Sequence, residues 1–374
     1  MREAFPAIDV VHVQTATAPL YHLVTAALSE SLGLGQAGTE VTGGTFAAVL
    51  AAVVVWFAGT VARGWCRALA VLPLLLSPYF WESALWMLND AAALLFGFGA
   101  LAVVLRRPDG RTAQLVVGML LAAAVATRQT YVWAVVPAMA AVLLANRHRP
   151  QAQLAAIGCR VAVPPLLVLT ALVVLWHGFV PPFFHEINAA TRSWVSLSYC
   201  FAVAAMFLTP VLLCVEQRRS VPRVVAVAAV GLAVLPALIF SSTATVSPDD
   251  TRRGGLIWGL VAHGPAVGGR SLVLVALAGT GAYVTCRLAA QLSPPCAVVA
   301  TTGLCALAVV LSAGGQLYQK YFELPIAALA VFAVCDALSA GTVTRRWPLC
   351  LLVAVQAMLT IGIVIRPIVS ALSG

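Results

Sequence analysis

Long apolar segments with hardly any charged residues recur along this chain from residue 46 to residue 367. A helix needs roughly 17 to 25 mostly apolar residues to cross the hydrocarbon core of a bilayer. Of the 374 residues, 61% are hydrophobic and only 9% are charged, whereas about a quarter of the residues of a soluble domain are charged. The sequence therefore predicts an all-α, polytopic transmembrane helical bundle and excludes an ordinary soluble domain.

About twelve such spans are predicted, together with outer-face loops and short interfacial helices. The segments are 46–62, 68–86, 91–105, 113–128, 130–145, 160–177, 197–215, 221–241, 271–289, 295–313, 323–338 and 347–366. This division leaves an outer N-terminal loop or interfacial segment (1–45), the bundle (46–367) and a short tail (368–374). No apolar stretch follows Met1 closely enough for a signal peptide, so none is expected.

Arginine is unevenly distributed between alternate loops. The loops after the odd-numbered spans carry fourteen of the twenty-two Lys and Arg residues, and the other loops and the two ends share eight. By the positive-inside rule the arginine-rich loops face the cytoplasm, so both termini are expected outside. The basic net charge of +9 is then a topology signal. Because no loop combines a basic patch with interleaved aromatic residues, nucleic acid is not an expected partner.

The segment 113–145 is too long for one span, because a single helix of that length would measure about 50 Å against a hydrocarbon core of about 30 Å. Arginine-rich loops flank it on both sides. We therefore expect a helical hairpin whose outer turn is Arg128-Gln129-Thr130. In this position Arg128 would lie at the outer membrane surface and avoid the cost of a charge at mid-bilayer depth.

The polar chemistry is expected on the outer face, where the longer loops gather isolated cations, carboxylates and aromatic side chains. Aromatic rings stack on sugars, and a cation at the bilayer boundary suits a lipid-linked phosphate. A carboxylate would serve as general base in that setting. No metal-ligand spacing and no phosphate-binding glycine loop occurs, so no metal and no other cofactor is expected. These features point to sugar transfer from a lipid phosphate.

Four segments carry a resemblance to a known family: TATAPLYHLV (15–24), WMLNDAAALLF (86–96), ATRQTYVWAVVP (126–137) and QKYFELPIA (319–327). Together they resemble the GT-C superfamily of polyprenyl-phosphate-sugar glycosyltransferases, and within it the dolichyl-phosphate-glucose alpha-1,2-glucosyltransferase family. The similarity is scattered over about 320 residues, and the Arg-Gln-Thr-x-x-Trp match is its most specific part.

The resemblance implies an inverting hexosyltransferase of a bacterial inner or plasma membrane. It would use a polyprenyl-phosphate sugar, act on a glycan or lipid acceptor at the outer face, and have membrane lipids as its surroundings. Asp9 is the candidate catalytic carboxylate. The candidate substrate-binding residues are Arg128, Gln129, Asp90, Lys320, Tyr321, Glu323, His185 and Glu186.

The chain departs from the family at its start. Such enzymes usually begin with a transmembrane helix that ends in an acidic pair, and no such helix precedes residue 46. Either this helix lies upstream of Met1, or the chain is a divergent or inactive member. A noncatalytic assembly subunit is a third interpretation, and a polytopic transporter or lipid flippase is the rival class. Against the rival, the charges gather at the outer rim and no internal repeat is visible.

Each candidate residue also has a structural interpretation. Arg128 would otherwise be a surface anchor at a helix turn, Gln129 would satisfy backbone groups at a helix end, and Asp90 would act as a simple N-cap. Asp9 would be a solvated loop acid. Lys320 would form a neutralised surface pair with Glu323, which contributes little stability.

His185 and Glu186 lie in an outer loop rich in Pro and Phe. From that loop we expect both side chains to line the substrate pocket.

Overall fold

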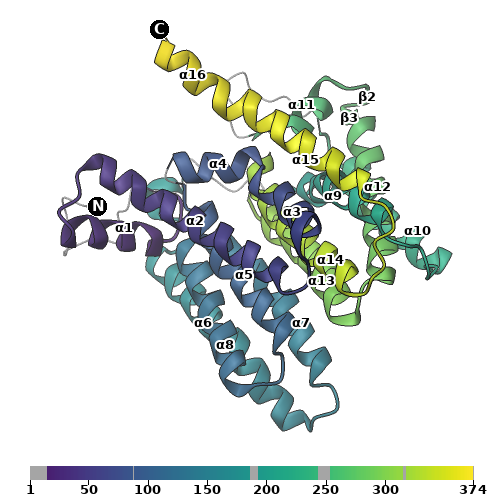
Figure 1. The fold of residues 1–374 in the computed structure, drawn as a ribbon, viewed down its shortest axis with the longest axis horizontal. Helices are drawn as coiled ribbons and strands as arrows, with labels where there is room; N and C mark the ends of the chain where they lie inside the picture. Colours follow the sequence, from purple (N-terminus) through teal and green to yellow (C-terminus); the bar gives the residue numbers. More distant parts are fainter. Residues whose placement is uncertain (1–14, 87, 186–192, 243–252, 315–316, 374) are drawn as a thin grey trace. The chain divides into compact units, whose positions relative to one another are not determined.

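The computed structural model describes residues 15–86, 88–185, 193–242, 253–314 and 317–373. The chain divides into two compact units. Unit 1 comprises Met1–Phe57, Pro78–Ala189 and Thr360–Gly374, and unit 2 comprises Ala58–Ser77 and Ala190–Leu359. Both units are helical, and the strands of the described residues are only two residues long (Figure 1). The predicted all-α class of a membrane protein is confirmed.

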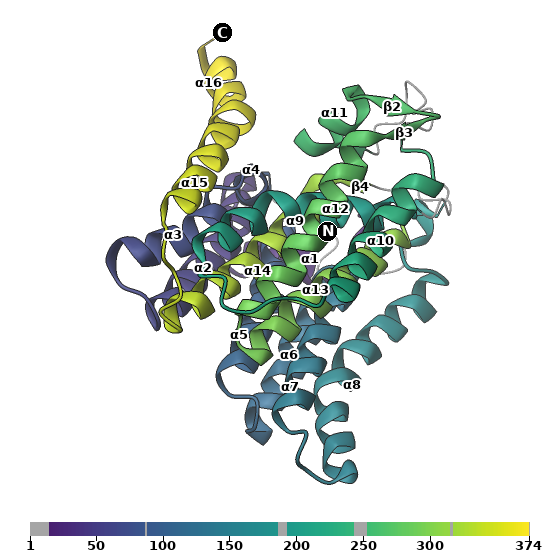
Figure 2. The same cartoon turned by 90° about the vertical axis from the view of Figure 1, so that its right-hand side faces the viewer.

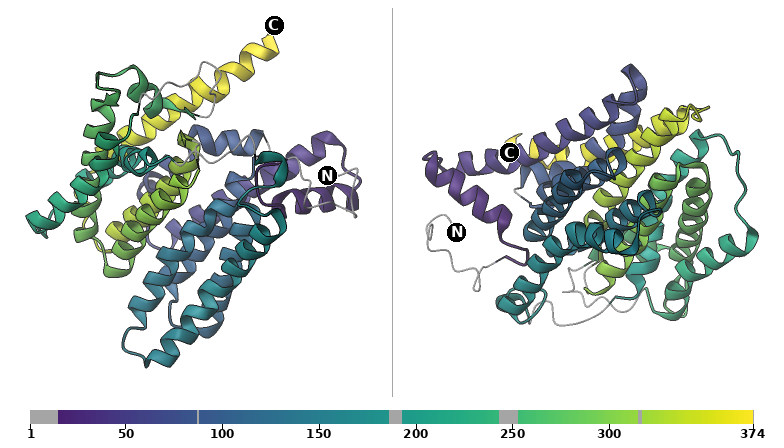
Figure 3. Two further views of the ribbon diagram at one scale, coloured as in Figure 1. Left: turned by 180° about the vertical axis from the view of Figure 1, so that it is seen from behind. Right: turned by 90° about the horizontal axis from the view of Figure 1, so that it is seen from below.

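Helices α5 to α8 lie side by side in unit 1 (Figures 1 and 3). The helices of this unit are α1 (Leu20–Ser31), α2 (Gln36–Gly59, whose last two residues belong to unit 2), α4 (Pro78–Leu85), α5 (Asp90–Arg106), α6 (Arg111–Thr127), η2 (Gln129–Ala134), α7 (Val135–Ala145), α8 (Gln151–Trp176), η3 (Pro182–Phe184), η4 (Ile361–Ile365) and α16 (Arg366–Ser373). The predicted N-terminal segment 1–45 thus contains α1 and the start of α2, and residues 368–373 of the predicted tail belong to α16.

The predicted hairpin at residues 113–145 is confirmed. Helix α6 ends at Thr127, and the short 3-10 helix η2 leads into α7. At the other end of the hairpin the Asn146 side chain, which follows α7, donates a hydrogen bond to the carbonyl of Pro108, which precedes α6, at 3.3 Å. The chain therefore leaves and returns at one end of unit 1. Arg128 lies at the opposite end, about 25 Å away along α6.

In unit 2, α14 forms the core, because its residues from Phe322 to Cys335 are all buried. It packs against α3, α9, α11 and α13, of which α9 and α13 can be followed beside α14 in Figure 2. The helices of this unit are α3 (Gly64–Leu75), α9 (Val195–Cys214), α10 (Arg223–Ile239), α11 (Leu256–His263), α12 (Leu272–Gln291), α13 (Pro294–Ser312), α14 (Gln319–Ser339) and α15 (Trp347–Thr360, up to residue 359).

Two short strand pairs accompany these helices. β1 (Arg253–Gly254) pairs with β4 (Leu317–Tyr318) in parallel, and β2 (Ala266–Val267) pairs with β3 (Arg270–Ser271) in antiparallel. The parallel pair brings the start of α11 next to the start of α14. This proximity matters for the polar cluster of unit 2 described below.

Each predicted span overlaps a helix, but the count of twelve is not established. Seven of the described helices are long and apolar enough to cross a membrane, or eight if α3 and α4 form one broken span. The predicted span 68–86 is interrupted between Leu75 and Pro78, and α6, α7 with η2, and α10 are shorter apolar helices. The chain is thus a multi-pass membrane protein by helix length and composition.

Glycine allows the closest helix contacts in each unit. A Cβ atom on Gly118 of α6 would lie 2.1 Å from the carbonyl oxygen of Arg160 in α8, and one on Gly281 of α12 would lie 1.8 Å from that of Phe201 in α9. Small residues let helix backbones approach in this way where the surrounding lipid is as apolar as the side chains. These two positions therefore require glycine.

We predict that Gly281→Ala destabilises the protein by about 1 to 3 kcal/mol or more, because the added methyl group meets backbone that no rotamer change can relieve. The matched control is Gly231→Ala in α10, where an added Cβ meets nothing within 4 Å and helix propensity favours alanine. Thermal unfolding in detergent measures both. Equal midpoints for the two variants would contradict the close approach of α9 and α12.

Candidate functional site

A buried ion pair lies at the turn end of the hairpin in unit 1. Arg128 Nη1 donates to the Asp90 carboxylate and also approaches Asn89 Oδ1 at 3.4 Å. Arg128 is only 8% exposed and Asp90 only 5%. The interpretation of Arg128 as a surface anchor is therefore wrong, because protein rather than solvent surrounds its charge.

The pair forms because two helix ends meet. Asp90 is the first residue of α5, and Arg128 follows the last residue of α6. The Asn89 amide donates to the carbonyl of Thr127 at 3.0 Å and holds the two ends together. Asn89 rather than Asp90 occupies the N-cap position, and its side chain makes no capping bond. The N-cap interpretation of Asp90 is therefore wrong, since its carboxylate meets the guanidinium of Arg128.

The side chain of Gln129 binds the backbone of two other segments of unit 1. Its Nε2 donates to the carbonyls of Ala16 and Phe179, both at 3.0 Å, and its Oε1 accepts from the amide of Ala18 at 3.0 Å. These bonds occupy both amide hydrogens and one acceptor position. Gln129 thus positions the chain before α1 and the chain after α8 beside the Arg128 turn, which favours the structural interpretation of this residue.

The segment that Gln129 holds contains further polar groups. The Thr15 and Thr17 hydroxyls lie 3.2 and 3.4 Å from Nε2 of His22. Burial lowers the pKa of the His22 imidazole below its ordinary value, which favours the neutral ring at pH 7. Burial also raises the pKa of Tyr21 to about 12.

Two buried donors of unit 1 have no hydrogen-bond partner among the described residues. They are the Tyr21 hydroxyl in α1 and the Trp133 indole N–H in η2. Most buried polar groups in proteins are paired with protein, water or ligand, so an unpaired one calls for an explanation. Trp133 lies in η2, the short helix that begins at Gln129. Tyr21 lies in α1, which starts two residues after Ala18, whose backbone N–H donates to Gln129.

Unit 2 contains a second polar cluster around Glu323. This residue lies in the second turn of α14 and is completely buried. Its two carboxylate oxygens accept from the Ser77 hydroxyl and from Nε2 of Gln319, each at 2.7 Å. The Oε1 of Gln319 accepts in turn from the backbone N–H of Ile257 at the start of α11. The cluster joins the chain just after α3 to the starts of α11 and α14.

The predicted surface pair between Lys320 and Glu323 does not form, because the carboxylate is bonded to Ser77 and Gln319 instead. The ammonium group of Lys320 lies 5.7 Å from the ring centre of Tyr318 and 5.6 Å from that of Tyr321. Both distances fall within the range of cation–π attraction. The Lys320 ammonium group thus lies beside two tyrosine rings at the start of α14.

Three predicted site residues remain, namely His185, Asp9 and Glu186. His185 Nε2 lies 2.8 Å from the carbonyl of Val180, a contact within its own loop. Asp9 and Glu186 lie outside the described residues.

The site residues predicted from the sequence do not include Asn89, Ser77 or Gln319. Each is a polar residue at or near the end of an apolar segment, which is the signal that could have singled them out. The described residues contain no group of three or more His, Cys, Asp or Glu side chains able to hold a metal ion. No family model matches the chain, and neither a curated protein nor a solved structure matches it.

We predict that Arg128→Ala and Asp90→Ala each destabilise the protein by about 3 to 5 kcal/mol, because each leaves one charge buried without its partner. The double variant Asp90→Asn/Arg128→Gln should be closer to wild type than either single variant. Denaturant or thermal unfolding in detergent gives these differences.

The matched control is the ion pair of Glu216 with Arg218, whose side chains are 47% and 58% exposed. Neutralising it as Glu216→Gln/Arg218→Gln should leave the unfolding midpoint unchanged. If Arg128→Ala were as stable as this control, the Arg128–Asp90 pair would not exist as described.

Proposed function

We propose that this chain transfers a sugar from a polyprenyl-phosphate donor to a glycan or lipid acceptor. The observation that carries the proposal is the buried Arg128–Asp90 pair at the hairpin turn. Charged residues within a membrane bundle are costly and are a functional-site hypothesis by default. A guanidinium matches the geometry of a phosphate group and is the donor best suited to bind it.

The position of these charges agrees with a lipid-linked substrate. Asp90 begins α5, and Arg128 directly follows α6. Both are thus at helix ends, which is where the proposal places the lipid phosphate. Substrate sites of transporters lie near the bilayer midplane, within interrupted helices.

The surroundings of the pair suit a sugar as well as a phosphate. The unpaired Tyr21 hydroxyl and Trp133 N–H are buried donors of the kind that sugar hydroxyls satisfy. The Tyr131 ring lies against Trp133, with 6.0 Å between the ring centres, and its hydroxyl is 3.5 Å from the carbonyl of Asp90. Aromatic residues and hydrogen-bond donors therefore accompany the cation in unit 1.

The reaction in this proposal is a single displacement. A carboxylate takes the proton from the acceptor hydroxyl, and the acceptor oxygen forms a bond to the anomeric carbon. The bond between that carbon and the phosphate oxygen breaks, and its electron pair leaves with the polyprenyl phosphate. The leaving group gains one negative charge, which Arg128 stabilises where it develops. Asp9 remains the expected base of this proposal.

Asp90 has a defined part in this scheme. Without substrate it neutralises Arg128 and holds the guanidinium in one orientation. A phosphate entering the site competes with Asp90 for the guanidinium and binds to it in Asp90's place or beside it. Removing the Asp90 charge should therefore strengthen donor binding even where it lowers turnover.

A transporter or lipid flippase is the second candidate, and one observation favours it. Glu323 is a completely buried acid inside a candidate span, with neutral partners. Intramembrane acids of this kind carry protons or ions in many transporters. The two functions differ in whether the donor is cleaved or only moved.

We predict that wild-type protein in liposomes releases polyprenyl phosphate from a radiolabelled polyprenyl-phosphate hexose when a membrane glycolipid extract is present. The folded double variant Asp90→Asn/Arg128→Gln should lose roughly a hundredfold or more of this rate. Glu216→Gln/Arg218→Gln is the control and should retain it. Wild-type liposomes that translocate a fluorescent donor without cleaving it would overturn the proposal in favour of transport.

A further inference from the structure

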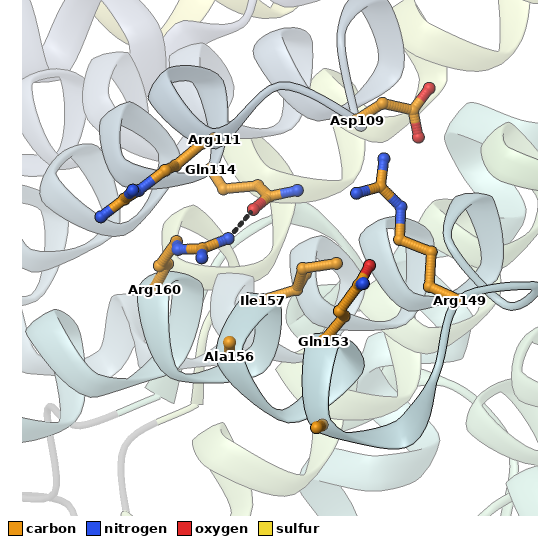
Figure 4. Close-up of a pocket in the computed structure, with 9 residues that line it drawn as sticks. Asp109, Arg111, Gln114, Arg149, Gln153, Ala156, Ile157 and Arg160 are labelled. Atoms are coloured by element: carbon orange, nitrogen blue, oxygen red, sulfur yellow. Dashed lines mark hydrogen bonds between the residues drawn. The ribbon is translucent and has the colours of Figure 1, made fainter.

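A basic pocket lies in unit 1 at the end opposite the Arg128 turn (Figure 4). Its volume is about 360 Å³, and Arg111, Arg149 and Arg160 line it together with Asp109, Gln114 and Gln153. Three guanidinium groups against one carboxylate give the pocket a net positive charge. It lies at the end of the hairpin where the α5–α6 and α7–α8 loops meet.

The charge of Arg160 is held by a neutral side chain. Its Nη1 donates to Oε1 of Gln114 at 2.9 Å, as Figure 4 shows, and Gln114 Nε2 donates to the carbonyl of Pro108. Gln114 is only 2% exposed. The close contact between Gly118 and the Arg160 backbone fixes the two helices at this point. The guanidinium is thus positioned without being neutralised.

Neither Arg111 nor Arg149 has an ion-pair partner among the residues that the structure describes. Two helix N-termini also border the pocket, because α6 begins at Arg111 and α8 at Gln151. Neither N-terminus has a side-chain cap. The free N–H groups and the helix dipole at such ends favour an anion. The three arginines and the two helix N-termini around the pocket therefore all favour binding of an anion.

The helix faces that carry these arginines continue as exposed apolar surface. On α6, Leu115 and Met119 follow Arg111 at intervals of four residues and are exposed, which places them on one face. On α8, exposed Val163 and Leu167 follow Arg160 by three and seven residues. An anion in the pocket would thus have apolar helix surface running from it into the membrane.

We propose that this pocket binds the phosphate of an anionic phospholipid, whose acyl chains lie along the apolar faces of α6 and α8. Basic pockets between transmembrane helices bind such headgroups in other membrane proteins. The proposal is independent of the sugar-transfer function, because the pocket shares no residue with the Arg128–Asp90 pair. A soluble phosphate has the same head chemistry, but it would leave the apolar faces unused.

The test uses full-length protein in detergent, titrated with fluorescent phosphatidylglycerol or phosphatidylcholine. Phosphatidylglycerol should bind more tightly. The variant Arg111→Gln/Arg149→Gln/Arg160→Gln should weaken its binding by at least about tenfold, since each arginine near a lipid headgroup contributes roughly fivefold. The matched control neutralises three arginines at and just before the start of α10, Arg218, Arg219 and Arg223, and should retain binding. Gln114→Leu should weaken binding, because it releases the Arg160 guanidinium.

Three outcomes would overturn the proposal. Equal loss in the pocket variant and the control would show diffuse electrostatic attraction. Equal affinity for both lipids would show that the net negative charge of the headgroup does not determine binding. Displacement of the labelled lipid by millimolar inorganic phosphate, but not by unlabelled phosphatidylglycerol vesicles, would assign the pocket to a soluble anion. Melting temperatures of all variants, compared with wild type, separate loss of binding from loss of fold.

Discussion

A hydrocarbon solvent cannot satisfy a polar group, and this constraint shapes both units of the chain. Every backbone N–H and C=O in the membrane must find a partner within the protein, so the spanning segments are helices. Charged side chains then have few permitted places, which are helix ends and sites where another protein group compensates them. Asp90, Arg128 and Glu323 occupy such places. Their positions follow from the cost of burying charge before any function is considered.

The two ends of the hairpin solve the problem of charge in different ways. At the turn, one guanidinium is buried and neutralised by the carboxylate of Asp90. At the opposite end, Arg160 is held by the neutral amide of Gln114, so that its charge remains available. The guanidinium of Arg128 is held in place but neutralised, so an anionic ligand must displace Asp90 or bind beside it. The arginines at the opposite end attract anions directly, but their guanidinium groups are less firmly oriented.

The hairpin could be predicted from the sequence because the prediction depends only on the length of the apolar segment 113–145. A segment of about 50 Å cannot cross a core of about 30 Å as a single helix, and the confirming contact between Asn146 and Pro108 follows from that topology. The number of spans could not be predicted in the same way, because α6, α7 and α10 have apolar composition but fall short of a full span. Composition reports which segments prefer lipid, whereas length decides which can cross it.

The partners of the site residues were beyond the reach of the sequence. Arg128 lies 38 residues from Asp90, and Ser77 lies 246 residues from Glu323. Local pattern predicted an N-cap for Asp90 and a lysine partner for Glu323, since neighbours along a helix are the only partners that spacing can show. The contacts that form instead depend on which helix ends meet in the folded bundle.

Gln129 has a structural role in unit 1 that its backbone contacts show. Its amide joins the chain before α1 and the chain after α8 to the turn that carries Arg128. Two residues of the Arg-Gln-Thr motif thus have different roles. Arg128 carries the buried charge, and Gln129 makes the hydrogen bonds to the backbone. The motif therefore has an architectural role, shown by the backbone bonds of Gln129, beside the chemical role that we propose for Arg128.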